Sequence, residues 1–142
     1  MTNEMRKIIS LFCMLVMLLV PCQTILASEA DTEYSVAPMM TYINDYLIAF
    51  SINDGVADVE VEVTGYPLET TRAKVIAELQ VKSGNNWIPV AIWTDDQDNY
   101  EAWVDETHDV VDGHTYRVKG TFMVWEGSAS ETEISYSDEI TA

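Results

Sequence analysis

The sequence predicts an all-β protein, an antiparallel two-sheet sandwich of about seven strands. Short segments in which apolar and polar residues alternate follow one another from residue 46 onward, which is the pattern of strands with one buried face. Turn residues separate these segments at regular spacing. No stretch of residues 28–142 has a convincing helical period. These three observations together favour a sandwich over any helical architecture.

The strand that ends at Trp125 is the clearest element of the predicted fold. Its two faces differ in character, with Tyr116, Val118, Phe122 and Val124 on one and Arg117, Lys119 and Thr121 on the other. A turn at Asp112 and Gly113 precedes it, and Tyr116 follows that glycine by three residues. This spacing indicates a tyrosine corner, in which the ring packs in the core and the hydroxyl bonds to backbone a few residues upstream. Such a corner is typical of immunoglobulin-like and fibronectin-type-III-like sandwiches.

The other strands follow from the same alternation. We expect them at residues 46–52, 56–64, 72–82, 87–93, 100–105 and 131–140. Asp54 and Gly55 indicate a hairpin between the first two, and Pro89, which lacks an N–H group, places the fourth at a sheet edge. Residues 94–99 are expected to form an acidic loop, and residues 106–112 a connection. Ile134 and Tyr136 are expected to face the core.

Residues 1–27 have the features of a secretory signal peptide. Arg6 and Lys7 precede an apolar run over residues 8–20, which is too short for a membrane-spanning helix of roughly 20 residues. Cleavage after Ala27 or after Ala30 fits, and an uncleaved membrane anchor is the alternative. We therefore expect a secreted, extracellular protein.

The mature chain is expected to hold a flexible leader at residues 28–44 and one β-sandwich domain at residues 45–142. The leader has no hydrophobic period. Cys22 does not indicate a lipoprotein, because Pro21 stands where a modified cysteine needs a small residue. The C-terminus has neither a wall-sorting motif nor an apolar tail, so we expect release without membrane contact after signal cleavage.

Cysteine content and charge exclude several classes of function. Cys13 and Cys22 both lie in the signal segment, which excludes a thiol nucleophile and a Cys-ligated zinc site in the mature chain. Cleavage after residue 27 removes one of 24 acidic and two of 7 basic residues, which leaves a net charge of −18. Such a charge argues against nucleic acid and anionic lipid as partners. It favours solubility outside a cell, with attraction to a cation or to a basic partner as the alternative.

A set of short motifs resembles a known family. They are Leu79-Gln80, Gly84, Trp87, Trp93, Tyr116-Arg117-Val118, Gly127, Glu131 and Ser135-Tyr136-Ser137. Together they are similar to small secreted proteins of Gram-positive, mostly clostridial, bacteria (Firmicutes) that carry a domain of unknown function. The resemblance covers the chain from Tyr46 onward. It implies a signal peptide and a single β-rich domain, and it implies no activity.

No residues in the sequence point to catalysis, and we expect no catalytic residues, no cofactor and no metal. No serine stands in a nucleophile-elbow setting. His108 and His114 are interpreted as exposed loop residues, with joint metal ligation as the alternative. The run from Asp95 to Asp98 is rich in the oxygen ligands that calcium prefers, but it does not match an EF-hand loop. A solvated loop is the favoured interpretation.

We expect a non-catalytic secreted module that binds an extracellular glycan or protein, with a small hydrolase or enzyme inhibitor as the alternative. Trp93 and Trp125 are the predicted ligand-binding residues. If the fourth strand turns its Ile-Val-Ile face to the core, Trp93 and Trp125 point the same way and Ile76 lies between them on one sheet. The competing arrangement buries Trp87 and Trp93 and leaves Trp125 alone at a strand end.

Overall fold

The computed structural model describes residues 40–142, so the expected signal peptide and most of the expected leader lie outside the described residues. The described chain contains eight strands and no helix, and hence no helix that could cross a membrane. The strands are β1 (Ile43–Asn53), β2 (Val56–Gly65), β3 (Arg72–Ser83), β4 (Asn86–Gln97), β5 (Glu101–Asp109), β6 (Thr115–Glu126), β7 (Ala129–Tyr136) and β8 (Ile140–Thr141).

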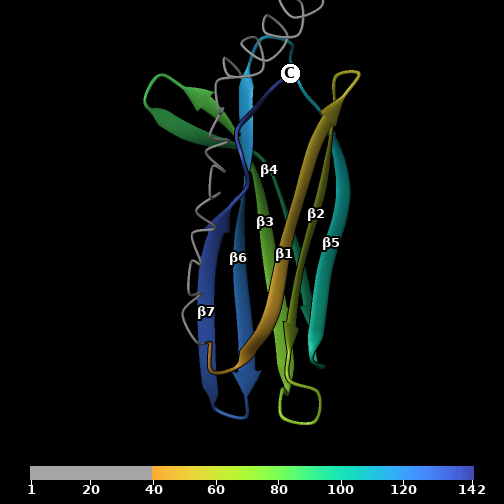
Figure 1. Ribbon diagram of the computed structural model, residues 1–142, viewed down its shortest axis with the longest axis vertical. Coiled ribbons are helices and arrows are strands. Elements are labelled where there is room, and N and C mark those ends of the chain that lie inside the picture. Colours follow the sequence, from red (N-terminus) through yellow and green to blue (C-terminus); the bar gives the residue numbers. More distant parts are fainter. Residues whose placement is uncertain (1–39) are drawn as a thin grey trace, which may run out of the picture. The chain divides into compact units, whose positions relative to one another are not determined.

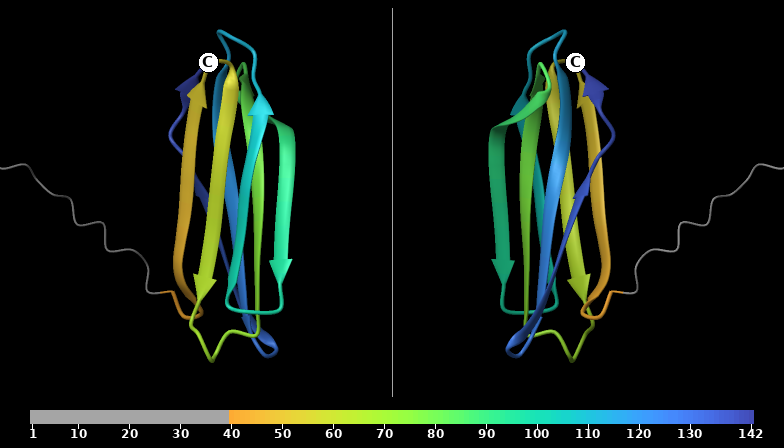
Figure 2. Two further views of the ribbon diagram at one scale, coloured as in Figure 1. Left: turned by 90° about the vertical axis from the view of Figure 1, so that its right-hand side faces the viewer. Right: turned by 90° about the vertical axis from the view of Figure 1, so that its left-hand side faces the viewer.

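The strands form two antiparallel sheets that pack as a sandwich, which confirms the predicted fold class. The smaller sheet has the order β1-β2-β5, and the larger has the order β4-β3-β6-β7, with β8 paired to β6. Figure 1 shows the long strands running side by side, and the side views in Figure 2 show the two layers. β3 lies between β4 and β6, as expected for a fibronectin-like strand order.

The core lies between the sheets and is built mainly from alternate residues of β1, β2, β3, β5 and β6. The ring centroid of Tyr46 in β1 lies 4.5 Å from the ring centroid of Phe122 in β6, so the two layers are in contact here. Each fully buried aliphatic or aromatic side chain contributes about 1.5–3 kcal/mol. The largest buried side chains are Ile43, Val59, Val61, Val63, Val75, Leu79, Val118, Phe122 and Val124.

The hairpin predicted between the first two strands is confirmed. Asn53 pairs with Val56, so Asp54 and Gly55 form a two-residue loop. Both have positive φ angles, 51° and 77°, as a turn that matches strand twist requires. Asp tolerates this region better than most residues with a side chain, and glycine adopts it without strain.

The predicted acidic loop at residues 94–99 is mostly strand. β4 continues to Gln97, with Asp95 opposite Val75 and Asp96 opposite Lys74 on β3. β5 likewise continues to Asp109 and takes up much of the expected connection at residues 106–112. Aspartate and asparagine favour turns when local preference decides, but here pairing with a neighbouring strand outweighs that preference.

The expectation that Ile134 and Tyr136 face the core is wrong. Thr121 on the outer face of β6 pairs with Ile134, whereas buried Phe122 pairs with Glu133. Side chains of paired residues lie on the same face of a sheet, so Ile134 points outward and Glu133 points inward at the sheet edge. The register, and not the hydrophobicity of the strand itself, decides which face is buried.

Glu131 explains why β7 turns carboxylates inward. Its two carboxylate oxygens accept hydrogen bonds from the backbone N–H groups of Thr41, Tyr42 and Ile43, at 3.1, 2.7 and 2.9 Å. The domain therefore begins before residue 45, since β1 starts at Ile43 and that side chain is buried. Burial raises the pKa of Glu131, but the bonds from Ile43, Tyr42 and Thr41 outweigh it and hold the pKa below its ordinary value.

The tyrosine corner is confirmed. The Val111 backbone N–H donates to the Tyr116 hydroxyl oxygen at 3.0 Å, and Tyr116 is only 4% exposed. The hydroxyl thus ties the loop before β6 to the core, and the ring anchors the start of that strand.

Removing the corner should destabilise the domain in two steps. Tyr116→Phe deletes only the acceptor for the Val111 N–H and should cost about 0.5–1.5 kcal/mol. Tyr116→Ala also leaves a cavity and should cost about 3–5 kcal/mol. Urea unfolding measures both, with Tyr100→Phe, at an exposed loop tyrosine, as the unaffected control. Equal stability of all these proteins would remove the basis for the corner.

Replacing Glu131 with Gln should lower stability by about 1–2 kcal/mol at neutral pH, because the amide cannot accept all three backbone bonds with a carboxylate's strength. Since the folded-state pKa is depressed, this stabilisation is complete above the ordinary value of 4.5 and is lost as pH falls through the native value.

The stability difference between wild type and Glu131→Gln should therefore shrink on acidification. Denaturant unfolding at a series of pH values measures it. Glu133→Gln, on the same face of the same strand, is the matched control. A difference that stays constant into the acid range would refute the proposed role of the carboxylate.

Candidate functional site

The outer face of the larger sheet collects every lysine and arginine of residues 40–142. They alternate with buried residues along β3 and β6, so all of them point away from the core. β3 supplies three and β6 supplies two, and the five are Arg72, Lys74, Lys82, Arg117 and Lys119. Although acidic residues far outnumber basic ones in the chain, this one face has more cations than carboxylates that contact them.

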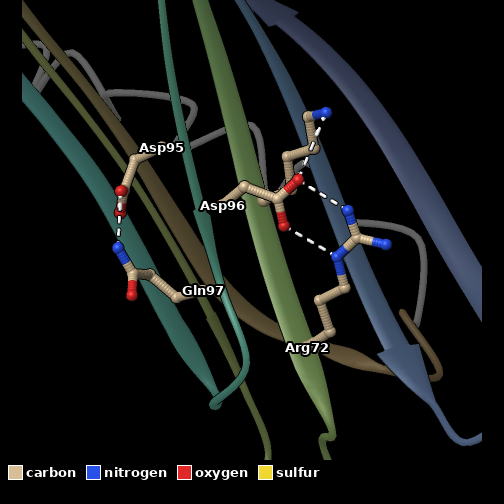
Figure 3. Close-up of polar contacts among 5 residues, drawn as sticks. Arg72, Asp95, Asp96 and Gln97 are labelled. Carbon is tan, nitrogen blue, oxygen red and sulfur yellow. Dashed lines mark hydrogen bonds and ion pairs between the residues drawn. The ribbon is translucent and has the colours of Figure 1, made fainter.

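Most of these cations are paired with carboxylates. Asp96 accepts two hydrogen bonds from the Arg72 guanidinium, at 2.7 and 2.6 Å, and lies 3.4 Å from the Lys74 ammonium (Figure 3). Hydrogen bonding to Arg72, together with the Lys74 contact, lowers the pKa of Asp96 despite some desolvation. Lys119 pairs with Glu78 and Lys82 with Glu139, each at 3.0 Å. These pairs order the long side chains.

Arg117 is held between two aromatic rings. Its guanidinium carbon lies 4.2 Å from the centroid of the Trp87 ring and 4.3 Å from that of Tyr136. Gln80 accepts a hydrogen bond from its Nε at 3.0 Å. Cation–π contacts at such distances are favourable, and the planar guanidinium suits stacking. The stack spans β4, β6 and β7.

The two tryptophans predicted to bind ligand lie on opposite faces of the larger sheet. Trp93 pairs with buried Ala77 and packs against the core, and its ring centroid lies 6.2 Å from that of His108 in an edge-to-face arrangement. Trp125 pairs with Arg72 on the outer face, and that guanidinium lies 4.6 Å over its ring. The structure therefore does not bring Trp93 and Trp125 into one patch.

A bulge in β4 separates the two tryptophans of that strand. The register shifts by one residue between Leu79 and Gln80 on β3, which leaves Val90 as the extra residue on β4. Beyond the shift Trp87 pairs with Lys82 and faces outward, although Trp87 and Trp93 are six residues apart and would otherwise share a face. Neither arrangement expected from the sequence allowed for this split.

Exposed aliphatic side chains lie on the same face of the sheet as the stack. Ile92 is 59% exposed and lies opposite Glu78, and Ile134 is 49% exposed and lies opposite Thr121. Ile76 lies between them on β3 and points outward as predicted. We call Ile92, Ile76, Ile134 and Tyr136, with the stacked Arg117, the apolar strip of the larger sheet.

The outer face of the smaller sheet has the opposite charge. β1, β2 and β5 contain no lysine or arginine, and Trp103 is 58% exposed there, next to Glu62. Burial raises the pKa of Glu62, and the neighbouring Glu101 raises it further, with smaller effects from Glu60 and Asp45. Trp103 was not singled out from the sequence, although its place between apolar Ala102 and Val104 indicates an outward position.

Two sets of residues are the candidates for a metal site, namely the acidic run from Asp95 to Asp98 and the two histidines. Asp95 and Asp96 point to opposite sides of β4, and Asp95 accepts from the Trp103 backbone N–H at 3.1 Å and from Gln97 at 2.7 Å (Figure 3). His108 packs on Trp93, whereas His114 lies 3.3 Å from the Asp112 carbonyl. Within residues 40–142 there is no group of three or more side chains suited to hold a metal ion.

Comparison with known proteins assigns no function. No protein-family model matches the sequence, and no curated protein matches it at a significant level. The resemblance to small secreted clostridial proteins stays a prediction from short motifs.

Calcium should have no effect on the stability of the folded domain. Asp96 is already neutralised by Arg72 and Lys74, and Asp95 is used by backbone and amide donors. Melting the protein in millimolar calcium and then in a chelator should give the same Tm. A rise of several degrees with calcium would contradict this, because a ligand that binds only the native state must stabilise it.

Proposed function

We propose that the protein is a non-catalytic extracellular binding module, and that the apolar strip of the larger sheet contacts a protein ligand. Export rests on the N-terminal signal features of residues 1–27. The carrying observation is the strip itself, in which Ile92, Ile134 and Tyr136 are exposed on one face of the sheet and Tyr136 stacks on Arg117. Apolar side chains gathered on one exposed face of a soluble protein often mark a site of interaction with another protein.

The chemistry of the strip fits a protein interface. Tryptophan, tyrosine and arginine are the residue types that most often dominate binding energy, and here Arg117 of the strip contacts both Tyr136 and the neighbouring Trp87. The stack and the ion pairs around it hold these side chains in place before binding. Less conformational entropy is then lost when a ligand docks.

A protein ligand is favoured over a glycan because guanidinium groups already cover tryptophan ring faces. Stacking on a sugar needs an open aromatic face. Arg72 lies over Trp125 and Arg117 lies over Trp87, so binding a sugar on those faces requires breaking a cation–π contact. Ile92 and Ile134 stay exposed, and aliphatic side chains suit apolar protein surfaces better than sugars.

The alternative of a hydrolase has less support. A catalytic carboxylate pair is expected in a cleft, where burial separates the two pKa values. The pKa of Glu62 is raised by burial and by Glu101, but both residues lie on an open sheet face. An enzyme inhibitor is a special case of a protein-binding module and would use the same strip.

The test is a capture experiment with the mature chain against cell-wall, glycan and host-protein fractions, followed by measurement of Kd for any captured ligand. Ile134→Asp and Ile92→Asp should each weaken binding at least tenfold, because each places a charge in the apolar strip. Leu68→Asp, at a fully exposed leucine in the β2–β3 loop, is the matched control and should bind normally. Capture of a purified glycan, or a protein ligand that binds all variants equally, would overturn the proposal.

A further inference from the structure

The outer face of the smaller sheet is an unpartnered surface of one charge. The pairing of β1, β2 and β5 places seven carboxylates on it, and these strands contain no cation to offset them. Glu60 and Asp105 are direct cross-strand partners, an arrangement of like charges that destabilises a sheet. The seven are Asp45, Asp58, Glu60, Glu62, Glu101, Asp105 and Asp109.

Three depressions mark this side of the domain, and each is lined by more than one carboxylate. One holds Asp45 and Glu62. A second holds Asp58, Glu60 and Asp105. A third, where β4 approaches β5, holds Asp95 and Glu101 together with Trp103. The surface therefore offers separate hollows for cationic groups.

Apolar side chains lie among these carboxylates. Leu47 and Trp103 flank Glu62 on either side across the sheet, and both are about half exposed or more. An exposed indole bordered by carboxylates suits an ammonium or guanidinium group, which the ring and the carboxylates attract together. A purely solubilising surface needs the charges but gains nothing from an exposed tryptophan.

A second copy of the chain would not neutralise this face. The only cationic surface among residues 40–142 carries five basic side chains, and Asp96, Glu78 and Glu139 already pair with four of them. Its balance of about two positive charges is too small to match seven negative ones. A metal ion is also disfavoured, since no group of three or more suitable ligands exists in the described chain.

We propose that the outer face of β1, β2 and β5 is a docking surface for a lysine- or arginine-rich polypeptide segment. The cationic side chains of the segment enter the carboxylate-lined depressions, and one of them stacks on Trp103. Alternate residues of an extended segment lie about 6.8 Å apart, the same repeat that separates carboxylates two residues apart on β2. A basic segment in β conformation thus matches the spacing of Asp58, Glu60 and Glu62.

Release of repulsion supplies part of the binding free energy. Native Glu62 holds its proton to higher pH than the unfolded chain, so its charge opposes folding at neutral pH. A cationic segment removes that opposition, and the gain should fall as salt screens the charges.

Fluorescence anisotropy with a labelled octapeptide of alternating lysine and serine tests the proposal at physiological salt. Wild-type protein should bind it and should not bind the glutamate–serine counterpart. The triple variant Glu60→Gln, Glu62→Gln, Asp105→Asn should weaken binding at least tenfold, and Trp103→Ala about fivefold. The triple variant should melt at or above the wild-type temperature, because it removes like-charge contacts, which separates lost binding from lost folding.

The matched control removes three carboxylates that lie in loops, with Glu69→Gln, Asp112→Asn and Asp138→Asn. It should bind within twofold of wild type. Equal weakening by both triple variants would mean that net charge alone attracts the peptide, which overturns the proposal. So would absence of binding, or self-association of the wild type that the Glu60, Glu62 and Asp105 changes abolish. None of these outcomes bears on the apolar strip, which lies on the other sheet.

Discussion

The antiparallel pairing of β3 with β6 is the contact on which the rest of the structure depends. Its register runs without interruption from Arg72 opposite Trp125 to Val81 opposite Tyr116. Every inward pair, such as Val75 with Phe122, belongs to the core, and the outward positions carry four of the five lysines and arginines of residues 40–142, with Lys82 just beyond the paired stretch. A slip of one residue would exchange the two faces, burying the cations and exposing the core. The tyrosine corner at Tyr116 ties one end of this register to the loop before β6, so one anchor positions both the core and the apolar strip.

Most of the fold could be predicted because its signals are local. Alternation within β2 and β6 and the turn residues at Asp54 and Gly55 act over a few residues, and the structure follows them. The buried face of a strand cannot be predicted where apolar and polar residues do not alternate. Residues 87–93 are apolar on both faces, so their pattern does not tell which side is buried, and the bulge at Val90 then divides their tryptophans between faces. Because of this division Trp93 faces the core, and it does not join Trp125 in the predicted patch.

The remaining misses come from contacts that are distant in sequence. Ile134 faces outward because β7 takes its register from β6 and because Glu131 reaches backbone groups 88 to 90 residues away. The Arg117 stack joins side chains of three strands, and no single segment contains its pattern. The alternation of residues around Trp103 predicts that its side chain points outward. The sequence does not distinguish it from the other three tryptophans as a binding residue. The outer faces of this fold are thus set by strand register, whereas the core follows from local pattern.

The outer faces of the two sheets differ in how their charges are balanced. On the larger sheet, carboxylates from β3, β4 and the segment before β8 pair with lysines and arginines, and this ordering would lower the entropy lost in the binding proposed for that face. On the smaller sheet, Glu60 and Asp105 face each other with no cation in the three strands, so the native state carries a repulsion that its core must offset. A domain without disulfides gains nothing in stability from such an arrangement, and solubility needs only net charge, not opposed like charges around an exposed tryptophan. A surface that is unfavourable in the free protein and favourable beside a cation is better explained by what it binds than by how the chain folds.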